Sequence, residues 1–206
     1  MLLLFDYDGV IADSFDSLLE VCVEAQAALG EGRAPGPEDF CSIENLTFDE
    51  LGRVIGLPAD KVASYAGKIF EIQSKGWETR PFPGIVDVIL KLAGENTLAV
   101  VTSSKADIIA AALDEFGIGG AMTAVTGGEA GVCKAARIAG LQAAHAATGE
   151  STFMIGDTVG DIRAGKEAGV RTAAVTWGFQ PRELLLKESP DCVLDSPYEL
   201  LGLAPA

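Results

Sequence analysis

The stretch LLLFDYDGVIADS, residues 2–14, places two carboxylates directly after a short apolar run. The run Leu2–Phe5 is typical of a strand buried on both faces, because it is short and continuous and a turn-forming residue, Gly9, follows it. Side chains alternate along a strand, so we expect Asp6 and Asp8 to point in the same direction. Two like charges side by side are unfavourable unless a cation or a proton compensates them. The stretch therefore predicts either a solvated acidic junction or a ligand site at a strand end.

The second half of the chain alternates between strand and helix patterns. Strands are predicted at 97–102, 121–126, 152–157, 171–176 and 191–194. Helices are predicted between them at 85–94, 106–117, 133–147, 161–169 and near 181–187. This alternation predicts an α/β fold with a Rossmann-like parallel sheet that helices cover on both faces. The first strand joins the same sheet, because its run is apolar on both faces.

A helical insertion separates the first strand from the rest of this sheet. Helices are predicted at 14–30, 47–56 and 58–77, with a loop rich in glycine and proline at 31–40. No strand pattern appears in this part of the sequence. We therefore expect an α/β core made of residues 1–13 and 81–206 and an all-helical cap at 14–80.

Composition narrows the classes of partner. The 206 residues are 49% hydrophobic and 22% charged, which is typical of a globular protein, and the net charge of −15 disfavours nucleic acid and anionic membranes as partners. No apolar run approaches the ~20 residues of a membrane span, and the start lacks the basic region of a signal peptide. We expect a cytoplasmic protein, either monomer or homodimer. The four cysteines are far apart, so neither a zinc site nor a disulfide framework is expected.

Polar groups follow the ends of several predicted strands. Ligands of open parallel sheets bind outside the carboxyl ends of the strands. The candidates there are Asp6, Asp8, Thr102, Ser103, Lys134, Asp157 and Asp161. Several carboxylates at one crevice require a hard cation, and oxygen ligands suit Mg²⁺. A lysine, a hydroxyl and the amides of a helix start can bind a phosphoryl group. The single histidine, His145, lies in an alanine-rich stretch and is expected on a helix surface.

The order and spacing of these groups resemble the haloacid dehalogenase superfamily, in its phosphoglycolate-phosphatase-like branch. The resemblance covers nearly the whole chain, including the cap. It is carried by DYDGVIADS (6–14), VVTSS (100–104), Lys134, GDTVGDIRAGKEAGV (156–170) and AVTWG (174–178). It implies a Mg²⁺-dependent phosphatase that hydrolyses a small phosphomonoester, phosphoglycolate-like or a sugar phosphate, through an aspartyl phosphate.

The resemblance also implies a role for each carboxylate. Asp6 is the nucleophile that takes the phosphoryl group, and Asp8 is the general acid for the leaving oxygen and then the base for water. Mg²⁺ is held by the Asp6 carboxylate, the Asp8 backbone carbonyl and Asp157, with Asp161 in support. Thr102, Ser103 and Lys134 bind the phosphate oxygens.

Two residues depart from the usual motifs. Ala135 follows the motif lysine where proline is common, so Lys105 is kept as a second candidate for the phosphate. Val10 replaces the commoner threonine, and valine occurs at this position in mutase-like relatives. The alternative functions are therefore a sugar-phosphate mutase of the β-phosphoglucomutase type and a catalytically silent binding protein with the same fold. Within the acidic cap, Arg33 and Arg53 are the candidates to bind a second anionic group of the substrate.

Overall fold

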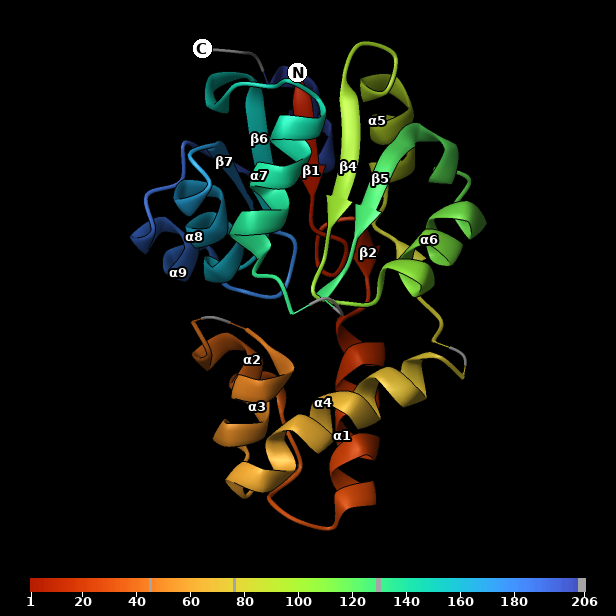
Figure 1. The fold of residues 1–206 in the computed structure, drawn as a ribbon, viewed down its shortest axis with the longest axis vertical. Coiled ribbons are helices and arrows are strands. Elements are labelled where there is room, and N and C mark those ends of the chain that lie inside the picture. The colour runs from red at the N-terminus through yellow and green to blue at the C-terminus, as the bar shows by residue number, and fades with distance from the viewer. Residues whose placement is uncertain (45, 76, 129–130, 204–206) are drawn as a thin grey trace.

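The computed structural model describes residues 1–206 except 45, 76, 129–130 and 204–206. Figure 1 shows an α/β core above a separate group of helices, which carries the labels α1 to α4. The core sheet has six strands in the order β5-β4-β1-β6-β7-β8, and every neighbouring pair is parallel. The strands are β1 (Leu2–Phe5), β4 (Thr97–Val101), β5 (Met122–Thr126), β6 (Thr152–Gly156), β7 (Arg171–Val175) and β8 (Cys192–Leu194). This is the predicted Rossmann-like architecture.

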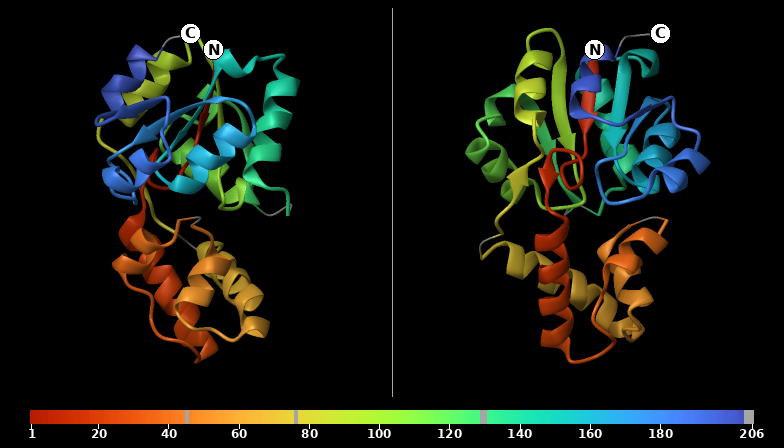
Figure 2. Two further views of the ribbon diagram at one scale, coloured as in Figure 1. Left: turned by 90° about the vertical axis from the view of Figure 1, so that its left-hand side faces the viewer. Right: turned by 180° about the vertical axis from the view of Figure 1, so that it is seen from behind.

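The first strand lies in the middle of the sheet, which explains its uninterrupted apolar run. Leu2 pairs in register with Thr97 of β4 on one side and Thr152 of β6 on the other. Helices cover both faces of this sheet (Figure 2). They are α5 (Ile85–Leu92), α6 (Ala106–Glu115), α7 (Lys134–Ala144), α8 (Val159–Glu167) and α9 (Arg182–Lys187), with short 3₁₀ turns at Gly119–Ala121, Gly149–Ser151 and Pro197–Gly202.

The two faces of β1 belong to two different hydrophobic clusters. Leu3 and Phe5 pack in one cluster with residues of α5 and α6, such as Ile89. Leu2 and Leu4 pack in another with residues of α7 and α8. Burial on both faces removes a large apolar area from water, so the position of β1 and of the carboxylates after it is firmly held.

The cap has a hydrophobic core of its own. Its helices are α1 (Phe15–Leu29), α2 (Pro37–Ser42), α3 (Phe48–Val54) and α4 (Ala59–Gln73). Leu18, Leu51 and Ile69 are buried together in this core, and the Tyr65 hydroxyl donates to the backbone carbonyl of Cys22 at 3.1 Å. The cap therefore packs as a unit apart from the sheet.

One helix of the cap contradicts the predicted loop at 31–40. The helix α2 starts at Pro37, whose fixed φ suits the first helical position, and the Asp39 carboxylate accepts the backbone N–H of Gly36 at 2.8 Å. The prediction of a loop is wrong for 37–40, because it rests on the glycine and proline content, whereas Pro37 marks a helix start.

The chain passes between core and cap through a short ribbon. Strand β2 (Ala12–Asp13) pairs antiparallel with β3 (Arg80–Pro81). Neither two-residue strand was predicted from the sequence. The ribbon holds the two crossing segments side by side.

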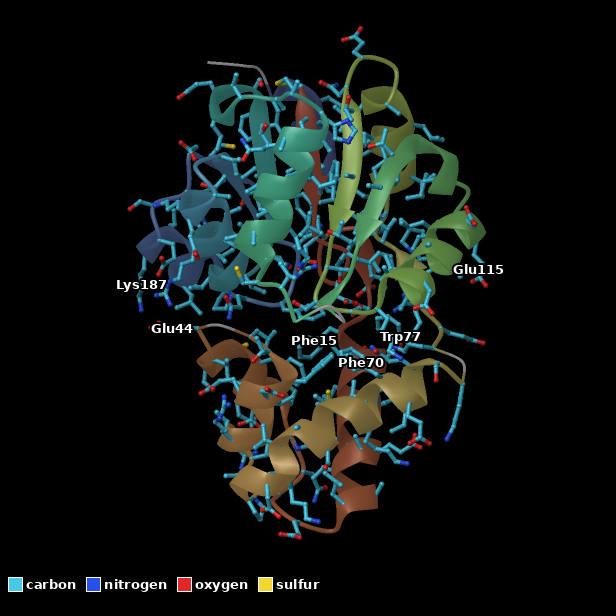
Figure 3. All side chains as sticks on the ribbon, in the orientation of Figure 1. Phe15, Glu44, Phe70, Trp77, Glu115 and Lys187 are labelled. Carbon is cyan, nitrogen blue, oxygen red and sulfur yellow. The ribbon has the colours of Figure 1, made fainter. Side chains whose placement is uncertain are left out.

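A loop of the core, 176–181, also contacts the cap. The Gln180 side chain is 1% exposed, donates to the Ile43 carbonyl of the cap at 2.7 Å and accepts the Val159 N–H of the core at 2.7 Å. The Phe179 ring lies 5.2 Å from that of Phe15, which Figure 3 labels where the cap meets the core. No helix among the described residues is both long and apolar enough for a membrane span.

Candidate active site

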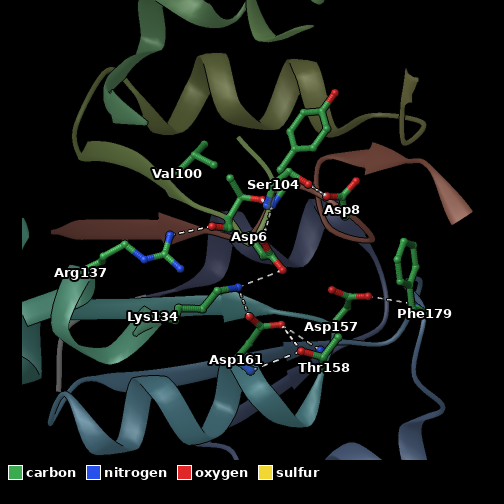
Figure 4. Close-up of polar contacts among 12 residues, drawn as sticks. Asp6, Asp8, Val100, Ser104, Lys134, Arg137, Asp157, Thr158, Asp161 and Phe179 are labelled. Atoms are coloured by element: carbon green, nitrogen blue, oxygen red, sulfur yellow. Dashed lines mark hydrogen bonds and ion pairs between the residues drawn. The ribbon is translucent and has the colours of Figure 1, made fainter. Parts of the chain in front are cut away.

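Asp6 stands immediately after β1 and is 8% exposed. Its Oδ1 accepts the backbone N–H of Tyr7 at 2.8 Å, and its Oδ2 lies 3.2 Å from Nζ of Lys134. The hydrogen bond from the Tyr7 N–H and the ammonium of Lys134 orient the carboxylate at the end of the central strand (Figure 4). A fixed carboxylate of this kind can act as a nucleophile or a metal ligand.

Asp8 lies in the tight turn that follows. Its Oδ1 accepts the Ser14 hydroxyl at 2.7 Å and its Oδ2 accepts the Ser104 hydroxyl at 2.8 Å. Burial raises the pKa of Asp8, although the two hydroxyls and Lys134 oppose the rise. The side chain is therefore held in one orientation and retains a proton more readily than an ordinary aspartate, as a general acid requires.

Asp157 follows β6 and is fully buried. Its Oδ2 accepts the Phe179 N–H at 2.7 Å, while its Oδ1 has no hydrogen-bond partner among the described residues. Two glycines make room for this carboxylate. A Cβ on Gly9, which has φ +76°, would lie 2.0 Å from Oδ2, and a Cβ on Gly178 would lie 2.4 Å from the same oxygen. Glycine is required at both positions by space, and at Gly9 also by its backbone conformation.

Asp161 combines a structural and an electrostatic role. It is the third residue of α8, and its Oδ2 accepts the N–H of Thr158 at 3.1 Å and the Thr158 hydroxyl at 2.6 Å, which completes a capping box. Its Oδ1 accepts Nζ of Lys134 at 2.6 Å. Lys134 thus bridges Asp161 and Asp6, and it begins α7.

The carboxylates of Asp6, Asp157 and Asp161 fit a hard cation. One oxygen from each lies within 4.8 Å of the others, and all three residues are buried. Burial is the main cause that raises the pKa of Asp6 to about 7 and the pKa of Asp157 well above its usual value, with neighbouring acids adding to both. The Oδ1 of Asp157, which has no hydrogen-bond partner among the described residues, fits a metal ligand. A divalent cation would compensate this excess negative charge.

Lys134 remains charged in this environment. Burial alone lowers its pKa, but the charges of Asp161 and Asp6 outweigh burial and raise it above the ordinary value. Its side chain is only 14% exposed. A buried ammonium between carboxylates can also bind the oxygens of an incoming phosphoryl group.

The three hydroxyl residues after β4 have different surroundings. Thr102 is 1% exposed, and its hydroxyl accepts the Ser104 N–H at 3.0 Å. Ser103 is exposed and lines the cavity described below, as does Ser104. Sequence reasoning missed Ser104, because the letters VVTSS do not reveal which hydroxyl reaches Asp8. It also missed Arg137, whose Nη1 donates to the Thr102 carbonyl at 2.6 Å.

A cavity of about 580 Å³ lies between the core and the cap. The predicted site residues that line it are Asp6, Asp8, Ser103, Lys134 and Asp161. Thr102 and Asp157 are almost completely buried instead. A volume of this size suits a small-molecule ligand.

The two arginines expected to bind a second anionic group of the substrate lie outside the cavity. Arg33 pairs with Asp39 and Arg53 pairs with Glu50 at 2.7 Å, both within the cap, and neither lines the cavity. Nζ of Lys105 lies 5.7 Å from the ring centre of Phe70. His145 is exposed at the end of α7, as predicted.

Known proteins of similar sequence include phosphatases. The chain is 26% identical over 205 residues to a phosphoglycolate phosphatase of Synechococcus elongatus, covering 97% of this chain and 94% of that protein. It is 27% identical to a probable phosphatase, IndB, of Dickeya dadantii, covering all of this chain and 94% of that protein.

Solved structures share the fold. A haloacid dehalogenase-like hydrolase from Streptococcus pneumoniae superposes with a TM-score of 0.88 at 22% identity, covering 98% of this chain and 96% of that chain. CbbY from Rhodobacter sphaeroides, solved with xylulose-1,5-bisphosphate, superposes with a TM-score of 0.76 at 21% identity, covering 97% and 95%. The profile of the family described as haloacid dehalogenase-like hydrolase matches residues 3–175. The chain therefore belongs to the haloacid dehalogenase-like hydrolases, in their phosphoglycolate-phosphatase-like branch, and is a phosphatase.

Proposed function

We propose that this phosphatase is Mg²⁺-dependent and hydrolyses a small phosphomonoester through a phosphoryl group carried on Asp6. The observation that carries the proposal is the surroundings of the Asp6 carboxylate. Lys134 lies 3.2 Å away, Asp157 and Asp161 lie close enough to share a cation, and Asp8 follows two residues later with both carboxylate oxygens hydrogen-bonded. The names of the related phosphatases agree with this chemistry.

The metal site in this proposal uses residues of two segments, which follow β1 and β6. Asp6, the backbone carbonyl of Asp8 and Asp157 hold Mg²⁺, and Asp161 supports the site. When bound, Mg²⁺ supplies positive charge that offsets the repulsion between the carboxylates and the phosphoryl oxygens. The crowding of Gly9 and Gly178 against Asp157 supports this assignment, because it keeps the carboxylate in place although one oxygen has no protein partner.

The reaction has two steps. In the first, a carboxylate oxygen of Asp6 forms a bond to phosphorus, the bond to the leaving oxygen breaks, and Asp8 gives its proton to that oxygen. In the second, Asp8 takes a proton from water, whose oxygen bonds to phosphorus and releases the Asp6 carboxylate with free phosphate. Thr102, Ser103 and Lys134 bind the phosphate oxygens in both steps.

The decisive experiment separates the nucleophile from the acid–base residue. With an aryl phosphate, whose leaving group departs without protonation, Asp8→Asn should release one burst of phenolate and then stall. A peptide containing Asp6 should retain one phosphoryl group, roughly +80 Da by mass spectrometry. Asp6→Asn should show neither the burst nor the label, because an amide is a poor nucleophile.

Asp107→Asn serves as the control, because this exposed carboxylate lies on α6 outside the cavity. It should turn over like the wild type. A label on Asp8, Ser14 or Thr102 would contradict the assigned roles, and the absence of any label would indicate direct attack by water.

The mutase alternative rested on Val10. In the structure Val10 is fully buried in the hydrophobic cluster that contains Leu3 and Phe5 of β1, so packing accounts for its side chain in either reaction. Hydrolysis is therefore retained as the proposal, and the range of phosphoglycolate-like or sugar phosphates stays a prediction.

A further inference from the structure

The cap contributes an almost entirely apolar wall to the cavity. Its apolar members, which we call the cap wall, are Leu18, Phe40, Leu46, Phe48, Leu51, Ala66 and Phe70. Leu18, Phe40 and Leu51 are buried in the cap core, and the other four are half-buried. The rings of Phe48 and Phe70 meet edge to face with centres 5.5 Å apart, and both residues are only half-buried. Figure 3 labels Phe70 where the cap faces the core. Aromatic surface left open toward a cavity favours a ligand that is itself apolar.

The only charged cap residue among the described residues lining the cavity is Asp49. It is exposed and stands in the first turn of α3. An anion on the leaving group would therefore meet a negative charge on the cap side. Removing a carboxylate from water without a counter-charge is unfavourable.

The cations that line the cavity on the core side already have partners. Lys134 is held by Asp6 and Asp161. Arg137 donates to the carbonyls of Thr102 at 2.6 Å and Thr126 at 3.0 Å.

Arg163 completes this set of cations. It pairs with Glu188 at 2.8 Å and with Glu44 at 3.0 Å. Of the lining cations in the described part of the chain, Lys134 is the one beside the proposed phosphoryl position, and none belongs to the cap. Lys105 of the core does not line the cavity, although its Nζ lies 5.7 Å from the ring centre of Phe70.

We propose that the substrate is a phosphomonoester of an uncharged, largely apolar alcohol, of the benzyl or aryl type, and that the cap wall binds this leaving group. The inference rests on the proposed phosphomonoester hydrolysis, but it departs from the range of phosphoglycolate-like or sugar phosphates that the sequence predicts. Esters with a second anion, such as acid phosphates of the phosphoglycolate kind and bisphosphates, are poor substrates. Discrimination comes from apolar contact with the cap wall and from repulsion by Asp49.

The test compares two esters that differ by one charge. Benzyl phosphate and 4-carboxybenzyl phosphate share the same benzylic leaving oxygen, so their reactivity is matched. With Mg²⁺ present, kcat/KM should be at least about tenfold higher for benzyl phosphate. It should also exceed the value for phosphoglycolate. An equal or higher kcat/KM for either charged ester would overturn the inference.

A charge reversal on the cap tests whether Asp49 causes the preference for the neutral ester. Asp49→Lys should reduce the preference for the neutral ester by about twofold to fivefold, the size of one exposed charge interaction. Asp60→Lys is the matched control, because Asp60 is also exposed in the first turn of a cap helix, α4, and does not line the cavity. An unchanged preference in Asp49→Lys, or an equal change in Asp60→Lys, would contradict the role of Asp49.

Binding of non-hydrolysable analogues keeps this inference separate from the proposed function. Benzylphosphonate should raise the melting temperature more than 4-carboxybenzylphosphonate, and Phe70→Ala should reduce that difference. If benzylphosphonate binds preferentially but no ester is hydrolysed, the proposed function fails, and only the binding of an uncharged apolar group to the cap wall stands. If esters are hydrolysed with the charged ones preferred, the function stands and the inference fails. If neither phosphonate binds, the inference is overturned.

Discussion

Asp157 in the core and Asp39 in the cap are both almost fully buried carboxylates, 0% and 3% exposed, but their surroundings are opposite. Burial raises the pKa of Asp157 well above its usual value, and the charges of Asp161 and Asp6 add to the rise. The Arg33 guanidinium is the main cause that holds the pKa of Asp39 below its usual value, and the N–H of Gly36 lowers it further.

The comparison separates an acid placed for stability from acids placed for a ligand. Asp39 has a cation and an amide for its two oxygens, so its ionised form favours the folded cap. Asp6 and Asp157 lie close together, and burial of their ionised forms opposes folding until a cation is bound. Perturbed carboxylates of the second kind are characteristic of functional sites.

Replacement of Asp157 should have the largest effect on activity, if this carboxylate is placed for a ligand and Asp39 for stability. In Asp157→Asn, turnover with Mg²⁺ should fall by more than the roughly 100-fold typical of residues that merely support a metal ligand. Mg²⁺ should raise the melting temperature of the wild type much more than that of the variant, because the ligand binds the folded state. Phosphate release and thermal melts with and without chelator provide the measurements.

The same variant makes a pH prediction with a definite sign. An acid whose pKa is raised by folding destabilises the protein as pH rises through the raised value. Without metal at neutral pH, Asp157→Asn should therefore be at least as stable as the wild type, and the difference in stability should shrink as pH falls toward 4.

A wild type that is equally active in excess chelator would rule out the metal site.

The glycine next to Asp157 gives a smaller effect on the same carboxylate. In Gly178→Ala the new Cβ would lie 2.4 Å from the Gly9 carbonyl oxygen as well as from Asp157, so the backbone must shift. Activity should fall by about 100-fold, as for a displacement of about 1 Å in a reacting group. The control is Gly67→Ala on α4, where no atom lies within 4 Å of the new Cβ. Full activity in Gly178→Ala would show that the position of Asp157 is not critical.

Asp39 gives the smallest effect, with the opposite dependence on pH. A lowered pKa stabilises the fold above the unfolded value near 3.8, and this contribution is lost as pH falls through the lowered value. Asp39→Asn should lower the melting temperature by a few degrees at pH 7 and progressively less below about pH 4. Phosphatase activity at low temperature should be unchanged. A melting difference that grows on acidification would invalidate the contrast with Asp157.

Much of the core could be predicted from local patterns. The run Leu2–Phe5 and the alternation of later segments depend on the burial of neighbouring side chains, which is visible within a few residues. The structure confirms two of these predictions, the parallel sheet and the exposed position of His145. The strand ends also placed Asp6, Asp157 and Asp161 near one another, because parallel strands end at the same edge.

Other features depend on contacts between distant segments and had no local signal. Ser104 reaches Asp8 across 96 positions of the sequence, and only the packed structure distinguishes its hydroxyl from that of Thr102. The two-residue strands β2 and β3 are too short for any pattern of alternation and exist because they pair with each other. The pairing of Arg33 with Asp39 likewise needed the helix start at Pro37. Residue types and their order thus encode the sheet and the set of reactive groups. The direction in which each side chain points follows from the packing of the cap against the core. That packing also places the apolar cap wall and Lys134 around the same cavity.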